Sequence, residues 1–140
     1  MELIDQRPKL VSFRALSFHG ENKGQANGTD KWTLELAQEI NMGLAVPMVP
    51  GAPLQAVVRV DLRATSKNTS SLTDSAEFSA VYEAKFNYLV SATEEAISPL
   101  FEQEPYQYTL AAQVFPLAMT HFRRELQSMG FDAGSLPLGL

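Results

Sequence analysis

The side chains best able to carry out acid–base chemistry are four glutamates. Glu35, Glu39, Glu77 and Glu83 occupy the polar positions of two stretches in which apolar and polar residues alternate. Two carboxylates at suitable separation can act as acid and base. Charged groups on the polar side of a half-buried strand are normally solvated, however. We therefore interpret these glutamates as surface charges.

The two histidines, His19 and His121, fall in no known catalytic or zinc-binding motif, since H-E-x-x-H and G-x-S-x-G are absent. The lack of cysteine excludes disulfides, thiol catalysis, iron–sulfur clusters and cysteine-ligated zinc. The glycines between Gly20 and Gly28 are not followed by Gly-Lys-Ser/Thr, so they form no phosphate-binding loop. We expect no enzyme activity, no metal and no cofactor.

The charge balance also excludes several partners. The chain has 11 Lys+Arg against 16 Asp+Glu, and its best basic pair is Arg123-Arg124, which is too little for a nucleic-acid surface. Residues 1–5 carry two acids where a secretory signal carries positive charge. The longest apolar stretch, 111–119, is too short for a membrane span. We expect a cytoplasmic protein that neither binds nucleic acid nor inserts directly into a membrane.

Four stretches alternate with the period of a β-strand: residues 10–19, 32–45, 55–64 and 76–90. The first is the weakest. The second is the clearest, with apolar positions at Trp32, Leu34, Leu36, Ile40, Met42 and Leu44. Turn-rich segments at 20–31 and 66–75 separate the strands. Strands of this kind belong to an antiparallel sheet with one covered and one solvated face.

After the sheet the period becomes helical. Ser91 and Glu94 fit a capping box for a brief helical turn. Apolar residues then recur every three or four positions over 106–129, and Gly130 supplies a stop. Pro116 removes one backbone hydrogen bond and predicts a kink. The predicted fold is α+β: one domain over residues 1–140, with a four-stranded antiparallel sheet and one long kinked C-terminal helix on one face.

One helix is too narrow to cover such a sheet, since it is about 10 Å wide and the strands are about 4.8 Å apart. The surplus apolar surface must bind a partner subunit or a ligand. Aromatic and methionine side chains suit an adaptable groove for polypeptide, although the same side chains are often core. The candidate groove residues are Met42, Leu44, Met48, Phe78, Tyr82, Phe101, Tyr106 and Tyr108, together with Phe86.

Several short motifs resemble, in their order, the bacterial SecB export-chaperone family. Residues 114–118, Val-Phe-Pro-Leu-Ala, are similar to its Leu-Phe-Pro-Tyr-Ala, and residues 130–138 to its Gly-x-Phe-Pro-x-Leu-x-Leu. Residues 16–19 are similar to its Ile-Ser-Phe-Glu, residues 32–35 to its Trp-x-Pro-Glu, and residues 82–84 to its Val-Glu-Val. The resemblance covers residues 10 to 140, although each motif is short.

The resemblance implies a dimer of dimers that holds unfolded polypeptides for export and translocation without ATP. It also implies subunit contacts through the helix and the first strand, which here gives Phe13, Val114, Leu117 and His121. The family docks the motor SecA through acidic residues on the open sheet face. Glu83 keeps one such acid, whereas Ala15 and His19 stand where the family has acids, which weakens the charge complementarity for SecA.

The leading hypothesis is therefore an ATP-independent holdase for non-native polypeptides. The family usually continues into a second helix beside the client groove, and this sequence ends at Leu140, so we expect a more open groove. Divergent relatives serve as dedicated chaperones of an antitoxin in a toxin–antitoxin system, which is the first alternative. A small-ligand-binding or enzymatic α+β domain is the second, and a purely structural oligomer subunit is the third.

Overall fold

The computed structural model describes residues 7–22, 32–68, 74–134 and 136–140. Four strands come first along the chain, and three helical elements follow. The strands are β1 (Lys9–Asn22), β2 (Trp32–Ala45), β3 (Gln55–Asn68) and β4 (Asp74–Asn87), and the helical elements are α1 (Glu94–Ile97), the 3-10 helix η1 (Ser98–Glu102) and α2 (Glu104–Ser128).

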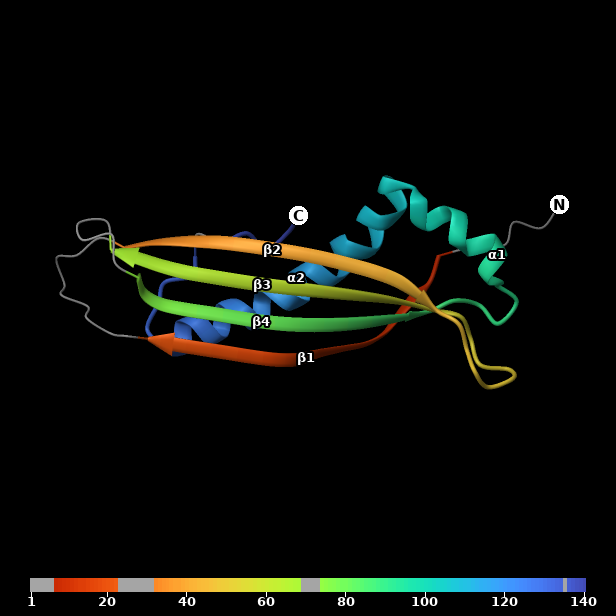
Figure 1. Cartoon of the computed structure of the whole chain (residues 1–140), viewed down its shortest axis with the longest axis horizontal. Coiled ribbons are helices and arrows are strands. Elements are labelled where there is room, and N and C mark those ends of the chain that lie inside the picture. Colours follow the sequence, from red (N-terminus) through yellow and green to blue (C-terminus); the bar gives the residue numbers. More distant parts are fainter. Residues whose placement is uncertain (1–6, 23–31, 69–73, 135) are drawn as a thin grey trace.

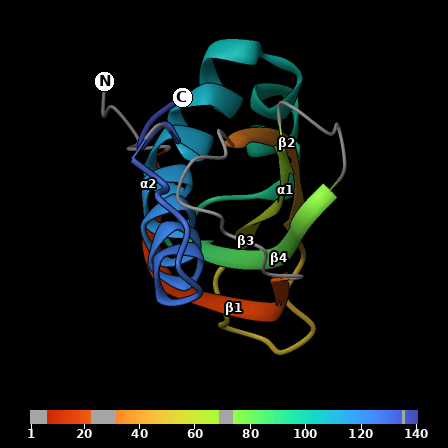
Figure 2. The ribbon, with the colours of Figure 1, turned by 90° about the vertical axis from the view of Figure 1, so that its left-hand side faces the viewer.

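The strands form one antiparallel sheet in the order β1-β4-β3-β2, and α2 crosses one of its faces (Figure 1). We call the face under α2 the covered face and the other the open face. Figure 2 shows the helix on a single side of the sheet. The predicted fold class, a four-stranded antiparallel sheet with one long helix, is confirmed.

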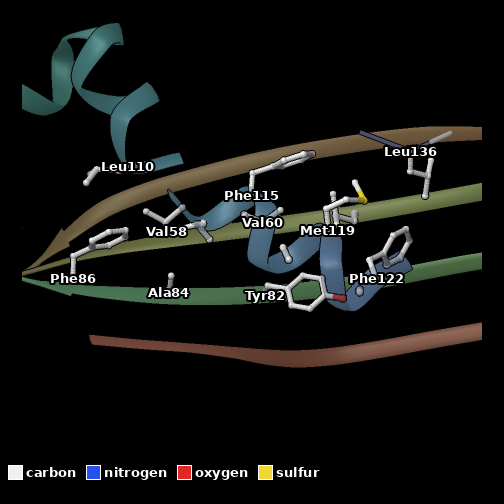
Figure 3. Packing of buried hydrophobic residues seen from close by; sticks show 14 of the residues in the cluster. Val58, Val60, Tyr82, Ala84, Phe86, Leu110, Phe115, Met119, Phe122 and Leu136 are labelled. Carbon is white, nitrogen blue, oxygen red and sulfur yellow. The ribbon is translucent and has the colours of Figure 1, made fainter. Parts of the chain in front are cut away.

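The core lies between α2 and the two central strands. Every second residue of β3 from Ala56 to Ala64 and of β4 from Ala76 to Phe86 points to the covered face and is buried, and Tyr88, just past the end of β4, is buried as well. The buried side chains of α2 are Leu110, Ala111, Val114, Phe115, Ala118, Met119, Phe122 and Leu126. Figure 3 shows how side chains from the sheet and from α2 meet in this core. The core therefore combines two residue periodicities: every second residue of the strands and about every 3.6th residue of the helix point into it.

Two bulges in β1 explain why residues 10–19 alternate so weakly. Val11 and Leu16 are each inserted without a counterpart in β4, so the register shifts at both places. Each inserted residue advances the alternation by one position. As a result Leu10, Phe13 and Phe18 all pack toward the core, although their sequence spacing does not follow period two.

The strands are longer than predicted at some ends. β1 continues to Asn22, and β3 continues to Asn68, so the predicted turns begin later than residues 20 and 66. The remainder of the predicted loop at 20–31 lies outside the described residues. β4 ends at Asn87 rather than at residue 90, because the next residues turn into α1.

The helix boundaries are mostly as predicted. The short helix is capped by Thr93, whose side chain accepts a hydrogen bond from the Ala96 amide, so the expected Ser91 cap is wrong. α2 runs through Pro116 as one element and ends before Gly130, which adopts a φ of +92° that only glycine adopts without strain. The kink at Pro116 stays a prediction.

Candidate functional site

The apolar side chains of β2 are only partly covered. Because β2 is the edge strand farthest from β1, α2 does not bury it as it buries β3 and β4. We call the half-buried residues of its covered face the β2 strip: Leu34, Leu36, Ile40, Met42 and Leu44. This is the apolar surplus that the width of the sheet predicts.

One end of the β2 strip lies near a group of aromatic residues. Leu44 shares a row across the sheet with Phe86, two residues before Tyr88. The Tyr88 hydroxyl hydrogen-bonds the Tyr106 hydroxyl, and the Tyr106 ring packs edge-on against Phe101 with ring centroids 5.5 Å apart. This group therefore fixes the start of α2 against the end of β4.

Burial makes Tyr88 and Tyr106 weaker acids than a solvent-exposed tyrosine. It raises the pKa of Tyr88 far above its ordinary value, and the hydrogen bond to Tyr106 raises it further. Burial also raises the pKa of Tyr106, against the opposing effect of the hydrogen bond from Tyr88. Because the two hydroxyls bond each other, the rings of this group are the part that can contact other side chains.

The other end of the β2 strip lies near the chain that follows α2. We call residues 131–134 and 136–140 the returning segment, because they run back along the helix (Figures 1 and 2). Phe131 packs edge-on against Phe78 at 5.3 Å, and Phe78 shares its row across the sheet with Leu36. Ala133 and Leu136 are buried in the same core, and Figure 3 shows Leu136 among its side chains.

The structure separates the predicted groove residues into two groups. Phe78, Tyr82 and Phe86 are buried in the core, at 2%, 0% and 0% exposure, so their assignment to an accessible groove does not fit this structure. The others are accessible to different degrees: Met42, Leu44, Phe101 and Tyr106 are half-buried, Tyr108 is exposed, and Met48 is 98% exposed in the turn between β2 and β3. The β2 strip and the aromatic group thus hold the accessible residues, apart from Met48 and Tyr108.

Two of the four predicted subunit-contact residues, Phe13 and His121, contact Tyr82. Phe13 stacks on its ring at 5.7 Å, and the Tyr82 hydroxyl lies 2.8 Å from His121 Nδ1. Val114 is buried in the core, while Leu117 is 40% exposed on α2. Burial, and secondarily the negative charge of Glu125, raise the pKa of Tyr82 well above its ordinary value. Of the four predicted residues, only Val114 lacks an accessible surface.

The open face carries the predicted SecA-docking acid. Arg14 Nη2 lies 3.0 Å from Glu83 Oε1, which makes Glu83 one half of an ion pair. His19 lies opposite Ser79 on the same face, whereas Ala15 lies opposite Tyr82, whose ring faces α2. The three positions taken from the resemblance are therefore not all on one face.

The open face is also hollowed. A hollow of about 890 Å³ lies over β1, β4 and β3, with a polar floor that includes Ser17, His19, Glu21, Asp61, Arg63, Glu77 and Ser79. It is thus unlike the apolar groove predicted from the sequence. Of the four glutamates considered for acid–base chemistry, Glu35 pairs with Lys67 at 3.4 Å and Glu83 with Arg14. The surface-charge interpretation fits this geometry.

Metal ligands do not gather in the described part of the chain. Within residues 7–22, 32–68, 74–134 and 136–140, no three His, Cys, Asp or Glu side chains come together as a metal site would require. No helix among these residues is both long and apolar enough to span a bilayer.

The sequence interpretation missed two features of this surface. Leu34, Leu36 and Ile40 were placed on the apolar side of a strand but were not named as groove residues, although their edge position decides their exposure. The returning segment was assigned no contact with the core or the groove. The signal that could have identified it is its apolar spacing, Phe131, Ala133, Leu136 and Leu138, after a helix stop.

Comparison with known proteins supports the fold. No protein-family model and no curated protein matches the chain. Among solved structures, the chain is similar to the Mycobacterium tuberculosis Rv1957 SecB-like chaperone in complex with a ChAD peptide from the Rv1956 HigA1 antitoxin. The TM-score is 0.67 at 18% identity, over 96% of this chain and 88% of that one. The protein therefore has the SecB-like fold, as the sequence motifs predicted.

Proposed function

We propose that the protein is an ATP-independent chaperone that binds extended, non-native polypeptide along the β2 strip. The observation that carries this proposal is the row of half-buried apolar side chains on an edge strand. From Leu34 to Leu44 the strip is about 33 Å long at the rise of a strand, which suits an extended segment of about ten residues. Burial of apolar surface supplies affinity without nucleotide.

The outer edge of β2 supports the same proposal. In the described sheet β2 pairs with β3 only, so its other edge presents backbone N–H and C=O groups. A client strand can pair there through main-chain hydrogen bonds, which do not depend on its sequence. Apolar side chains and a free strand edge together suit many clients rather than one.

The test is suppression of aggregation of a chemically unfolded model protein, without nucleotide. We expect suppression by the wild-type protein and its loss in Met42→Asp, which places a charge in the β2 strip. Asn41→Asp is the matched control, because it adds the same charge to the same strand on the exposed open face. Equal suppression by both variants, with thermal unfolding showing both folded, would contradict the assignment of the strip.

A second candidate function is a dedicated chaperone of one antitoxin. It is favoured by the similar Rv1957 structure, which holds an antitoxin peptide. This candidate predicts that unrelated unfolded proteins are not protected from aggregation. A labelled ChAD peptide should bind the wild-type protein and lose its affinity in Met42→Asp. Protection of several unrelated proteins would favour the general holdase. Export and a cytosolic location are part of the general proposal, whereas Ala15 and His19 at positions where the family has acids disfavour SecA docking.

We also propose that the edge of β1 contacts a second copy of the chain. Val11 and Leu16, the two bulged residues, are exposed apolar side chains on this edge, and Leu117 is exposed on α2, which packs against β1. A sheet edge and an apolar surface of this kind are typical of symmetric contacts. Sedimentation of Leu16→Asp against wild type tests it, and an unchanged oligomer size would contradict it.

A further inference from the structure

We propose that the returning segment is a built-in occupant of the client-binding surface, and that Arg123 and Tyr108 bind the main chain of a client in its place. This inference rests on the proposed function, because it names a class of contact and a form of regulation for that surface. The support for it is a set of contacts that the segment makes with the rest of the protein. Any extended apolar polypeptide could make the same kinds of contact.

The chemistry of the segment is that of a client. Its apolar residues are spaced two or three apart, it contains glycine and proline, and it forms no helix or strand. Leu136 is only 6% exposed and Ala133 is fully buried, so the segment inserts small and medium apolar side chains into the core. An unfolded polypeptide offers the same side chains from an irregular backbone.

Two side chains of α2 bind the segment through its carbonyl groups. Arg123 Nε donates to the Ala133 carbonyl oxygen at 3.1 Å, and the Tyr108 hydroxyl donates to the main-chain oxygen of Leu140, the last residue described, at 3.3 Å. Every residue of a client carries such a carbonyl, so these donors recognise a main chain whatever its sequence. The geometry therefore gives α2 two sequence-independent contacts.

The spacing of these donors fixes the path of the segment. Tyr108 and Arg123 are 15 residues apart, which is about 22 Å along a helix. Ala133 and Leu140 are seven residues apart, and seven extended residues span at most about 25 Å. The segment therefore runs antiparallel to α2 over more than half of its length, along a path that a client segment of similar length would follow.

The segment also covers a predicted groove residue. The Phe131 ring packs against Phe78 at 5.3 Å, and Phe78 is 2% exposed with the segment in place. Phe78 lies in the same row as Leu36 of the β2 strip. Displacement of Phe131 would extend the strip inward over β4, so the proposal predicts that Phe78 contacts the client in the displaced state.

A client binds only those molecules in which the internal occupant is displaced. The apparent affinity for the client is therefore the intrinsic affinity multiplied by the fraction of such molecules. If about one molecule in ten has the segment displaced, removal of the segment tightens client binding about tenfold. A segment that instead forms part of the client site would have the opposite effect, since its removal would weaken binding.

The experiment compares the full chain with a version that stops after Gly130. Binding of fluorescein-labelled, reduced and carboxymethylated lactalbumin is followed by anisotropy. We expect about tenfold tighter binding by the shortened chain, and displacement of the label by a synthetic peptide of sequence 131–140. Equal or weaker binding, or a peptide that fails to compete, would overturn the proposal.

Point variants keep the test decisive if the shortened chain does not fold. Leu136→Asp should release the segment and tighten client binding, whereas Leu138→Asp, at a position 50% exposed, should leave it unchanged. Either no gain in Leu136→Asp or an equal gain in both variants would overturn the proposal.

The main-chain contact has its own control. In the shortened or the Leu136→Asp background, Arg123→Gln should weaken client binding about tenfold, the effect expected for one hydrogen bond from a charged donor. Arg124→Gln, at the exposed neighbouring position, should not. Equal effects of the two changes would remove Arg123 from the proposal.

Failure of the proposed function gives a different result. The lactalbumin probe would then bind no form of the protein, while the labelled 131–140 peptide would still bind the shortened chain and lose affinity in Arg123→Gln. In that case the segment would be an ordinary part of the core, and the client role assigned to it would be wrong.

Discussion

Removing the hydrogen bond between Tyr82 and His121 should lower the free energy of unfolding by different amounts, depending on which of the two residues is replaced. With the imidazole proton on Nε2, toward Glu125 Oε1 at 3.5 Å, the Tyr82 hydroxyl donates to Nδ1 at 2.8 Å. Tyr82 is fully buried, whereas His121 is 40% exposed at its side chain. The tyrosine therefore depends on this acceptor, while the histidine can turn to water.

Tyr82→Phe keeps the ring and its stacking on Phe13, and the His121 side chain, which is 40% exposed, can rotate to hydrogen-bond water. Its cost should be that of one ordinary hydrogen bond, about 1 kcal/mol. His121→Ala leaves a buried hydroxyl without its acceptor, at about 1–3 kcal/mol, and removes an edge-on ring contact worth about 0.5–1.5 kcal/mol. Alanine returns up to about 0.6 kcal/mol of helix propensity, so the expected cost is about 1–4 kcal/mol, centred on about 2.5 kcal/mol.

Urea unfolding followed by far-UV circular dichroism gives each free energy of unfolding. In the double variant no hydroxyl is left to be unsatisfied, so its cost should fall about 1 kcal/mol or more below the sum of the two single costs. His121→Asn, which can present an amide oxygen to the hydroxyl, should recover part of the loss. A cost for Tyr82→Phe equal to that of His121→Ala, or strict additivity, would refute the reasoning.

Three further predictions concern stability. Burial raises the pKa of both Tyr82 and Tyr88 in the folded state, so the unfolded chain loses these protons first. The free energy of unfolding should then fall above about pH 10, by at most about 1.4 kcal/mol per pH unit for each tyrosine, and less steeply in Tyr88→Phe; a flat alkaline profile would contradict this. Gly130→Ala should cost about 1–2 kcal/mol by urea unfolding, because its φ is +92° while nothing lies within 4 Å of the added Cβ. Leu62→Ala in the core should cost about 2–5 kcal/mol, and exposed Leu89→Ala no more than about 0.5 kcal/mol; similar losses in both would count against the core assignment.

The sequence predicted the fold well where local periodicity and burial agree. β2 was predicted with its observed bounds, since no bulge interrupts its pairing with β3. β1 was the weakest prediction because Val11 and Leu16 each shift the alternation, and a bulge is set by pairing with β4 rather than by local sequence. The end of α2 could be predicted from Gly130, whose conformation is a local property.

The site could be predicted only in outline. The width of the sheet implied surplus apolar surface, but alternation places Phe78 and Met42 on the same face without telling which one the helix covers. Strand order decides that, because β4 lies under α2 and β2 lies at the edge. Strand order depends on contacts between distant parts of the chain, so periodicity alone could not separate core from client surface.

Hydrogen–deuterium exchange with and without an unfolded client tests the central claim most directly. On client binding, the amides of β2 should become more protected, residues 131–134 and 136–140 should become less protected, and β1 should change little. Protection confined to other strands, or no protection of β2 at a client concentration that gives binding, would contradict the account.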